Sequence, residues 1–161
     1  MQISKAMADL MNAQVGNELG ASNQYVQIAS YFDGESLSKL AKFFYDQAEE
    51  EREHAMKFVH YLMDVGADLS IAAIPATKTD IGTAEKAFEM SLGWEQEVTR
   101  QIYDMVDLAI EEKDYASRAF LQWFVTEQVE EVSTMERMLQ VVRKAGEKNL
   151  LMMEAYLSHD D

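Results

Sequence analysis

Residues 48–58, AEEEREHAMKF, carry Glu51 and His54 three residues apart within a long apolar heptad pattern. The inward positions of this pattern alternate in steps of three and four, and they are Leu37, Leu40, Phe44, Gln47, Glu51, His54, Phe58, Tyr61 and Val65. Such steps place all members on one face of an α-helix. A carboxylate and an imidazole therefore point into the expected core, where charged groups are normally paired or bound to a metal ion. Glu-x-x-His alone is an unspecific motif.

Three other stretches have the same apolar period, and each again carries polar residues near its middle. These inward polar residues are Gln14 and Glu18 in the first stretch, Ser91 and Glu95 in the third, and Gln128 and Glu131 in the fourth. Turn signals near 33–35, through 66–83 and near 112–114 separate the four stretches. The pattern predicts an all-α fold with four long helices.

The connection between the second and third helices is expected to cross over the length of the bundle. Residues 66–83 contain Pro75, the only proline, together with Gly66 and Gly82. Eighteen extended residues can run back along a helix of about 43 Å, whereas adjacent antiparallel helices need only a short loop. After Gly146, residues 149–157 predict a short fifth helix, which must pack on this bundle or on other subunits. We expect residues 1–161 to form a single domain.

Composition excludes several classes of function. The chain has no cysteine, which leaves oxygen and imidazole ligands as the practical metal chemistry. Its 29 acidic and 14 basic residues give a net charge of −15, so nucleic acid and anionic membranes are disfavoured as partners. The first twenty residues resemble neither a signal peptide nor a membrane span. A cytoplasmic location is expected.

The inward polar residues are also expected to lie at matching heights. Glu18 lies 17 residues before Glu35 and Glu51 lies 16 after it, while Glu95 and Glu131 each lie 18 residues from Lys113. Helices joined by tight turns meet at equal distances from the turn, so each pair is level. Four converging carboxylates with one imidazole and one amide would repel one another unless cations neutralised them. Two iron or manganese ions suit this ligand set, with zinc as a competitor and copper less suited without further histidines.

On these motifs the chain resembles the bacterial non-haem ferritins over its whole length. The matching segments are NELGASNQY, EEEREH, WEQE and LQWFVTEQVEE, which supply Glu18, Tyr25, Glu50, Glu51, His54, Glu95, Trp123, Glu127, Gln128, Glu130 and Glu131. The resemblance implies a first iron site of Glu18, Glu51, His54 and Glu95, and a second completed by Glu95 and Glu131. It further implies a third iron site formed by Glu50, Glu127 and Glu130. Gln128 would lie beside the bound oxygen species, and Tyr25 would donate an electron or hydrogen-bond a ligand.

Some positions separate the chain from related families. Bacterioferritins carry Glu-x-x-His twice, whereas this chain has Gln128 and Glu131 at the second motif. They also hold haem through a methionine where this chain has Arg52, so no haem is expected. The four-cysteine domain of rubrerythrins is ruled out by composition. Arg118 and Leu121 replace the acidic pair that lines the three-fold pores of animal ferritins, which puts iron entry by that route in doubt.

The resemblance implies a ferroxidase and iron-storage subunit that assembles into a 24-subunit shell and uses dioxygen or hydrogen peroxide as oxidant. Two alternatives stay open on the sequence. One is a di-iron peroxidase or oxygenase of the same structural class that stores no mineral. The other is a non-catalytic acidic bundle that serves as a binding or scaffolding module. Gln14 and Gln47 are expected to support the ligands or to have plain structural roles, and His60 and His159 are not counted as ligands.

Overall fold

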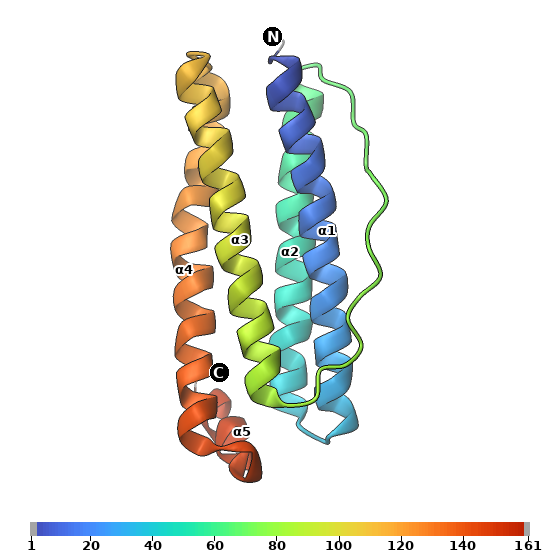
Figure 1. Ribbon diagram of the computed structural model, residues 1–161, viewed down its shortest axis with the longest axis vertical. Helices are drawn as coiled ribbons and strands as arrows, with labels where there is room; N and C mark the ends of the chain where they lie inside the picture. The colour runs from blue at the N-terminus through green and yellow to red at the C-terminus, as the bar shows by residue number, and fades with distance from the viewer. Residues whose placement is uncertain (1–2, 160–161) are drawn as a thin grey trace.

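The computed structural model describes residues 3–159, which form four long helices and a short fifth one (Figure 1). The elements are α1 (Lys5–Gly34), α2 (Ser38–Asp64), α3 (Ala84–Glu111), α4 (Tyr115–Ala145), a 3-10 turn (Glu147–Asn149) and α5 (Leu151–Ser158). The all-α class and the positions of the three breaks are confirmed. Among the described helices, none is long and apolar enough to cross a membrane.

Side chains at the helix starts explain most of these boundaries. Ser4, Thr83 and Asp114 each accept a hydrogen bond from the backbone N–H three residues later, which satisfies a free donor of the first turn. Gly146, with φ of +75°, ends α4 in a conformation that side chains disfavour. Leu37 cannot supply such a cap to α2. That helix obtains its cap from elsewhere in the chain.

The bundle consists of two antiparallel hairpins, α1 with α2 and α3 with α4, joined by the expected crossover. The link of residues 65–83 runs back along α1, so that α2 and α3 point in the same direction (Figure 1). Polar side chains of α1 fasten it at four places. Asn12 bonds the backbone of Asp68 and Ser70, Gln24 that of Lys78, Gln27 the side chain of Thr77, and Tyr31 the backbone of Gly82. The link is thus bound to the helix surface despite its lack of secondary structure.

Two apolar clusters fill the bundle, one towards each end. One cluster includes Phe32, Phe44 and Phe88, and the other includes Phe58 and Phe124. The inward polar residues of the four helices lie between the two clusters. Of the inward positions expected for α2, only Tyr61 is partly exposed, and its hydroxyl group shares a hydrogen bond with Ser117. The inward faces were otherwise predicted correctly.

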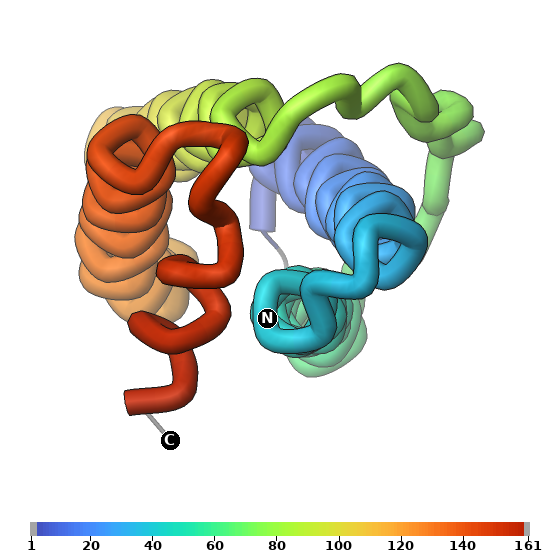
Figure 2. Tube along the Cα trace, turned by 90° about the horizontal axis from the view of Figure 1, so that it is seen from below, coloured from blue at the N-terminus to red at the C-terminus, as the bar shows by residue number. Residues whose placement is uncertain are grey.

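The short α5 folds back across the end of its own bundle (Figure 2). The Glu154 carboxylate accepts hydrogen bonds from the backbone N–H groups of Lys39, at 2.9 Å, and Leu40, at 3.0 Å. It supplies the cap that α2 lacks. Glu147 does the same for the start of α3, and Met153 is buried beneath α5. The fifth helix was expected to pack either on its own bundle or on other subunits, and the structure shows that it packs on its own bundle.

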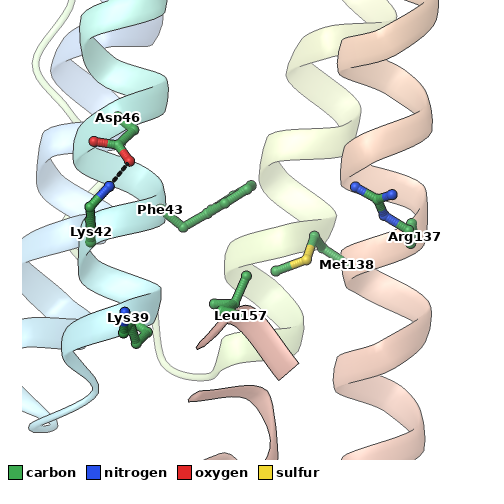
Figure 3. A pocket seen from close by; sticks show the side chains of 7 residues that line it. All are labelled: Lys39, Lys42, Phe43, Asp46, Arg137, Met138 and Leu157. Carbon is green, nitrogen blue, oxygen red and sulfur yellow. Dashed lines mark hydrogen bonds and ion pairs between the residues drawn. The ribbon is translucent and has the colours of Figure 1, made fainter. Parts of the chain in front are cut away.

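A cavity of about 240 Å³ lies where α2, α4 and α5 meet (Figure 3). Phe43, Met138 and Leu157 form its apolar wall, and Lys39, Lys42, Asp46 and Arg137 complete its lining. Lys42 is paired with Asp46 within this lining. None of the inward polar residues at mid-bundle belongs to this lining, so this cavity is separate from the candidate site.

Replacing Glu154 with alanine should release the start of α2 together with α5. Loss of a helix cap of this kind typically costs about 0.5–2 kcal/mol. Hydrogen exchange should become faster at the amides of Lys39 and Leu40. The matched variant Glu147→Ala should instead expose the amides of Ala84 and Glu85. Unchanged exchange at Lys39 and Leu40 in the first variant would show that Glu154 does not cap α2.

Candidate metal centre

The six inward residues predicted at mid-bundle are brought together by four different helices. Glu18 comes from α1, Glu51 and His54 from α2, Glu95 from α3, and Gln128 and Glu131 from α4. All six are buried. Because helices α1 to α4 each deliver at least one group to this layer, the site exists only in the assembled bundle. The crossover places the two hairpins at the same height, which counting along the sequence could not do.

Two groups of potential ligands share one carboxylate. Glu18, Glu51 and His54 offer one ligand atom each, and these atoms all lie within 4.8 Å of one another. Glu51, Glu95 and Glu131 do the same. Glu51 belongs to both groups, so its carboxylate is shared by two neighbouring candidate cation positions. The arrangement is that of two adjacent cation positions with a carboxylate between them.

Neighbouring side chains hold the carboxylates in place. The Gln14 amide donates to Glu18 Oε1 at 2.8 Å, and the Tyr25 hydroxyl group donates to Glu95 Oε1. The Gln128 amide donates to Glu95 Oε2 and to its backbone carbonyl oxygen, both at 3.2 Å. The two oxygen atoms of Glu95 thus have different partners. Tyr25 donates to Oε1, and Gln128 donates to Oε2. These contacts orient ligands in the way that outer-sphere groups do in metal sites.

The electrostatics of the cluster disfavour the charged form of every carboxyl group. Burial, reinforced by the charge of Glu51, raises the pKa of Glu18 well above its ordinary value. Burial raises the pKa of Glu95 to about 7, against the opposing effect of the hydrogen bonds from Tyr25 and Gln128. Burial and the charge of Glu95 raise the pKa of Glu131 to about 9. A bound cation would reverse this preference and release protons.

The residues present fit a pair of hard cations. Glu18 Oε2 and Glu51 Oε1 are buried and have no hydrogen-bond partner among the described residues. Orphaned carboxylate oxygens in a core are costly, and a metal ion is the usual compensation. Four carboxylates with one imidazole suit iron or manganese, whereas thiolate-requiring sites are ruled out. The carboxylate and histidine cluster is therefore chemically suited to bind metal.

The residues predicted for a third iron site lie on the side of the cluster nearer the surface. Glu50 is exposed as a residue, but partial desolvation of its carboxyl group raises its pKa, and this group faces Glu127 and Glu131. The Gln47 amide donates to Glu50 at 2.8 Å, so Gln47 contacts this group rather than the central carboxylates. Glu130 is exposed. A third site of Glu50, Glu127 and Glu130 remains a prediction.

The structure also shows contacts that the sequence reasoning missed. Gln128 lies near the Thr99 hydroxyl group, at 3.3 Å, and Thr99 stands four residues after Glu95 on the same helix face. The four-residue spacing from Glu95 to Thr99 could have indicated from the sequence that Thr99 lies beside the cluster. His54, Glu127 and Glu131 form a further group of potential ligands within 4.8 Å. The approach of Glu127 to His54 had no signal in the α4 pattern, because Glu127 lies one residue away from the inward positions.

The comparisons with known proteins agree with this geometry. Residues 8–145 match the model of the family described as "Ferritin-like domain". The chain is 39% identical over 145 residues to a protein of Staphylococcus aureus described as "Bacterial non-heme ferritin", covering 90% of this chain and 87% of that protein. It is also 39% identical over 151 residues to "Ferritin BfrB" of Mycolicibacterium smegmatis, covering 94% and 83%.

A solved structure shows the same fold throughout. The open pore ferritin of the archaeon Archaeoglobus fulgidus superposes with a TM-score of 0.93 at 33% identity, covering 97% of this chain and 96% of that one. The four-helix bundle with crossover and short fifth helix is thereby confirmed. The similarity to non-haem ferritins that the motifs indicated is confirmed as well. The chain belongs to the ferritin family, the iron-storage proteins.

Proposed function

We propose that this ferritin oxidises Fe(II) at the buried cluster and stores the Fe(III) product as mineral inside a hollow shell of 24 subunits. The observation that carries this proposal is the convergence of four carboxylates and one imidazole in an apolar core, with two orphaned oxygens. Two Fe(II) ions give up two electrons, and dioxygen with two protons takes them to become hydrogen peroxide. Hydrogen peroxide as oxidant would instead yield water.

Each residue has a distinct role in this proposal. Glu18, Glu51, His54 and Glu95 would hold the first iron, and Glu95 with Glu131 would complete the second. Glu51 belongs to both groups of potential ligands. Hard carboxylate oxygens stabilise Fe(III) over Fe(II), which favours oxidation. Tyr25 and Gln128 keep Glu95 oriented through their hydrogen bonds. Tyr25 is also an oxidisable side chain that hydrogen-bonds a ligand directly, so it is the candidate electron donor.

Exposed apolar side chains at both ends of the bundle support assembly with further copies of the chain. Tyr115, at the start of α4, is 71% exposed, and Leu151, on α5, is 75% exposed. Met152 beside Leu151 is also exposed, so α5 presents a second apolar face after packing on its own bundle. A monomer would leave these surfaces in water. A closed symmetric oligomer buries them.

The experiment that tests this proposal combines mass with iron retention. The purified protein should elute with the mass of about 24 chains and retain hundreds of iron atoms per particle after aerobic loading. A stable monomer or dimer that releases its iron would favour the alternative of a di-iron peroxidase or oxygenase. Anaerobic titration should show about two Fe(II) per chain, with more if the third site fills. Less than one Fe(II) per chain would favour the non-catalytic bundle.

The remaining expectations belong to the same proposal. We infer that residues 1–161 act as one ferritin-like domain and that the protein works in the cytoplasm without haem. Arg52 at the place of the haem-binding methionine supports the last point. The optical spectrum of the purified protein, without a haem Soret band, is the measurement that checks it.

A further inference from the structure

Two aromatic rings of one α4 segment pack against the His54 ring. Its centroid lies 5.4 Å from the Trp123 ring and 6.0 Å from the Phe124 ring, and both contacts are edge-on. Lys57 lies 4.3 Å above the Trp123 ring, so Trp123 itself has a fixed neighbour. The His54 side chain is only 5% exposed. The plane of the imidazole is therefore set by aromatic packing.

The two ring nitrogens of His54 face different carboxylates. Nδ1 lies 3.6 Å from Glu51 Oε2, on the side of the central cluster. Nε2 lies 3.9 Å from Glu127 Oε1. A neutral imidazole has one N–H donor and one lone pair, so only one nitrogen can serve as a metal ligand. Which nitrogen that is depends on what the other one contacts.

We propose that Glu127 is a positioning residue that accepts the Nε2–H of His54 and thereby directs the Nδ1 lone pair towards Glu18 and Glu51. The Glu127 side chain is 26% exposed, which leaves it room to turn and shorten the 3.9 Å separation into a hydrogen bond. The resulting chain of carboxylate, imidazole and metal is a recurrent way to fix a histidine ligand. This inference rests on the proposed function and adds the orientation of its single imidazole ligand.

The positioning role differs from the role of a third-site ligand in its response to substitution. A hydrogen-bond acceptor can be replaced by the amide oxygen of glutamine, whereas glutamine is a poor substitute for an anionic iron ligand. Glu136 offers a matched control, because it is a glutamate of the same helix, is exposed, and belongs to no predicted metal site. The glutamine and alanine variants of Glu127 thus separate a positioning role from direct ligation.

The test uses Co(II), whose visible absorption reports its ligands, as a probe of the assembled protein. Glu127→Ala should weaken the tightest Co(II) site by about 10–100-fold, the usual effect of losing an outer-sphere partner, and should alter its absorption bands. Glu127→Gln should restore both affinity and spectrum, and Glu136→Ala should leave both unchanged. Each variant should keep the mass of the assembled protein.

Two results would overturn the positioning role. One is wild-type affinity and spectrum in Glu127→Ala, and the other is a Glu127→Gln variant as weak as Glu127→Ala, which would indicate direct ligation. The variant His54→Ala distinguishes failure of the positioning role from failure of the proposed metal centre. If His54→Ala weakens Co(II) binding but Glu127→Ala does not, only the positioning role fails. If neither variant weakens it, the proposed metal centre fails too.

Discussion

Replacing Glu95 and His54 together with alanine is expected to abolish rapid aerobic oxidation of Fe(II), slowing its initial phase by at least about 100-fold. The double variant removes one ligand from each of the two groups that share Glu51. It also removes a buried carboxylate that the apolar core disfavours, so the bundle should still fold. Stopped-flow absorbance after mixing anaerobic Fe(II) protein with oxygenated buffer measures the rate.

The chain provides a matched control for this experiment. Glu97 and His60 are the same residue types on the same two helices, but both are exposed to solvent. Glu97 is paired with Arg100 at the surface, and such pairs contribute little to stability. Glu97→Ala with His60→Ala should therefore oxidise Fe(II) at the wild-type rate. Rapid oxidation that survives in the Glu95 and His54 variant would refute the assignment of the site.

The fold could be predicted because local signals and the apolar period agree along most of the chain. Thr83 and Asp114 mark helix starts, Gly146 marks a helix end, and the inward positions of α1, α3 and α4 are all buried. The length of the link at 65–83 then selected the crossover over the simple up-down bundle. The role of Glu154 escaped this reasoning, because it caps a helix that lies more than a hundred residues earlier in the chain.

The sequence allowed us to predict which residues form the candidate site, but not how their side chains are arranged in it. Periodicity identifies which residues face inward, so Glu18, Glu95 and Glu131 could be found without a structure. It cannot show which oxygen lies near which neighbour, since this depends on side-chain rotamers and on packing between hairpins. The position of Glu51 in both ligand groups and the approach of Glu127 to His54 therefore emerged only in three dimensions.

The raised pKa values predict that the metal-free protein loses stability as the pH rises. In the unfolded chain Glu131 ionises near its ordinary pKa of 4.5, but burial raises its pKa in the folded protein to about 9. Between these values the folded state holds a proton that the unfolded state has released. Folding therefore takes up a proton in this interval, and the free energy of unfolding falls as the pH rises through it. Glu95, with a pKa of about 7, contributes in the same direction.

Glu131→Gln should remove much of this penalty, because a neutral amide replaces the buried carboxylate. At pH 9 the metal-free variant should be more stable than wild type by on the order of 1–3 kcal/mol, the usual cost of an uncompensated buried polar group. At pH 5 the two proteins should differ little. Glu136→Gln, an exposed change on the same helix, should follow wild type at both pH values. Thermal unfolding followed by circular dichroism measures these differences.

Divalent metal should invert the order of the two proteins. A bound cation compensates the charges of the cluster, so saturating Co(II) at pH 9 should stabilise wild type far more than Glu131→Gln, which lacks a ligand. The same carboxylate would then weaken the metal-free protein and strengthen the loaded one, because burial and the charge of Glu95 raise its pKa until a cation compensates them. An equal gain in both proteins, or a stability difference that does not change between pH 5 and pH 9, would contradict this account of Glu131.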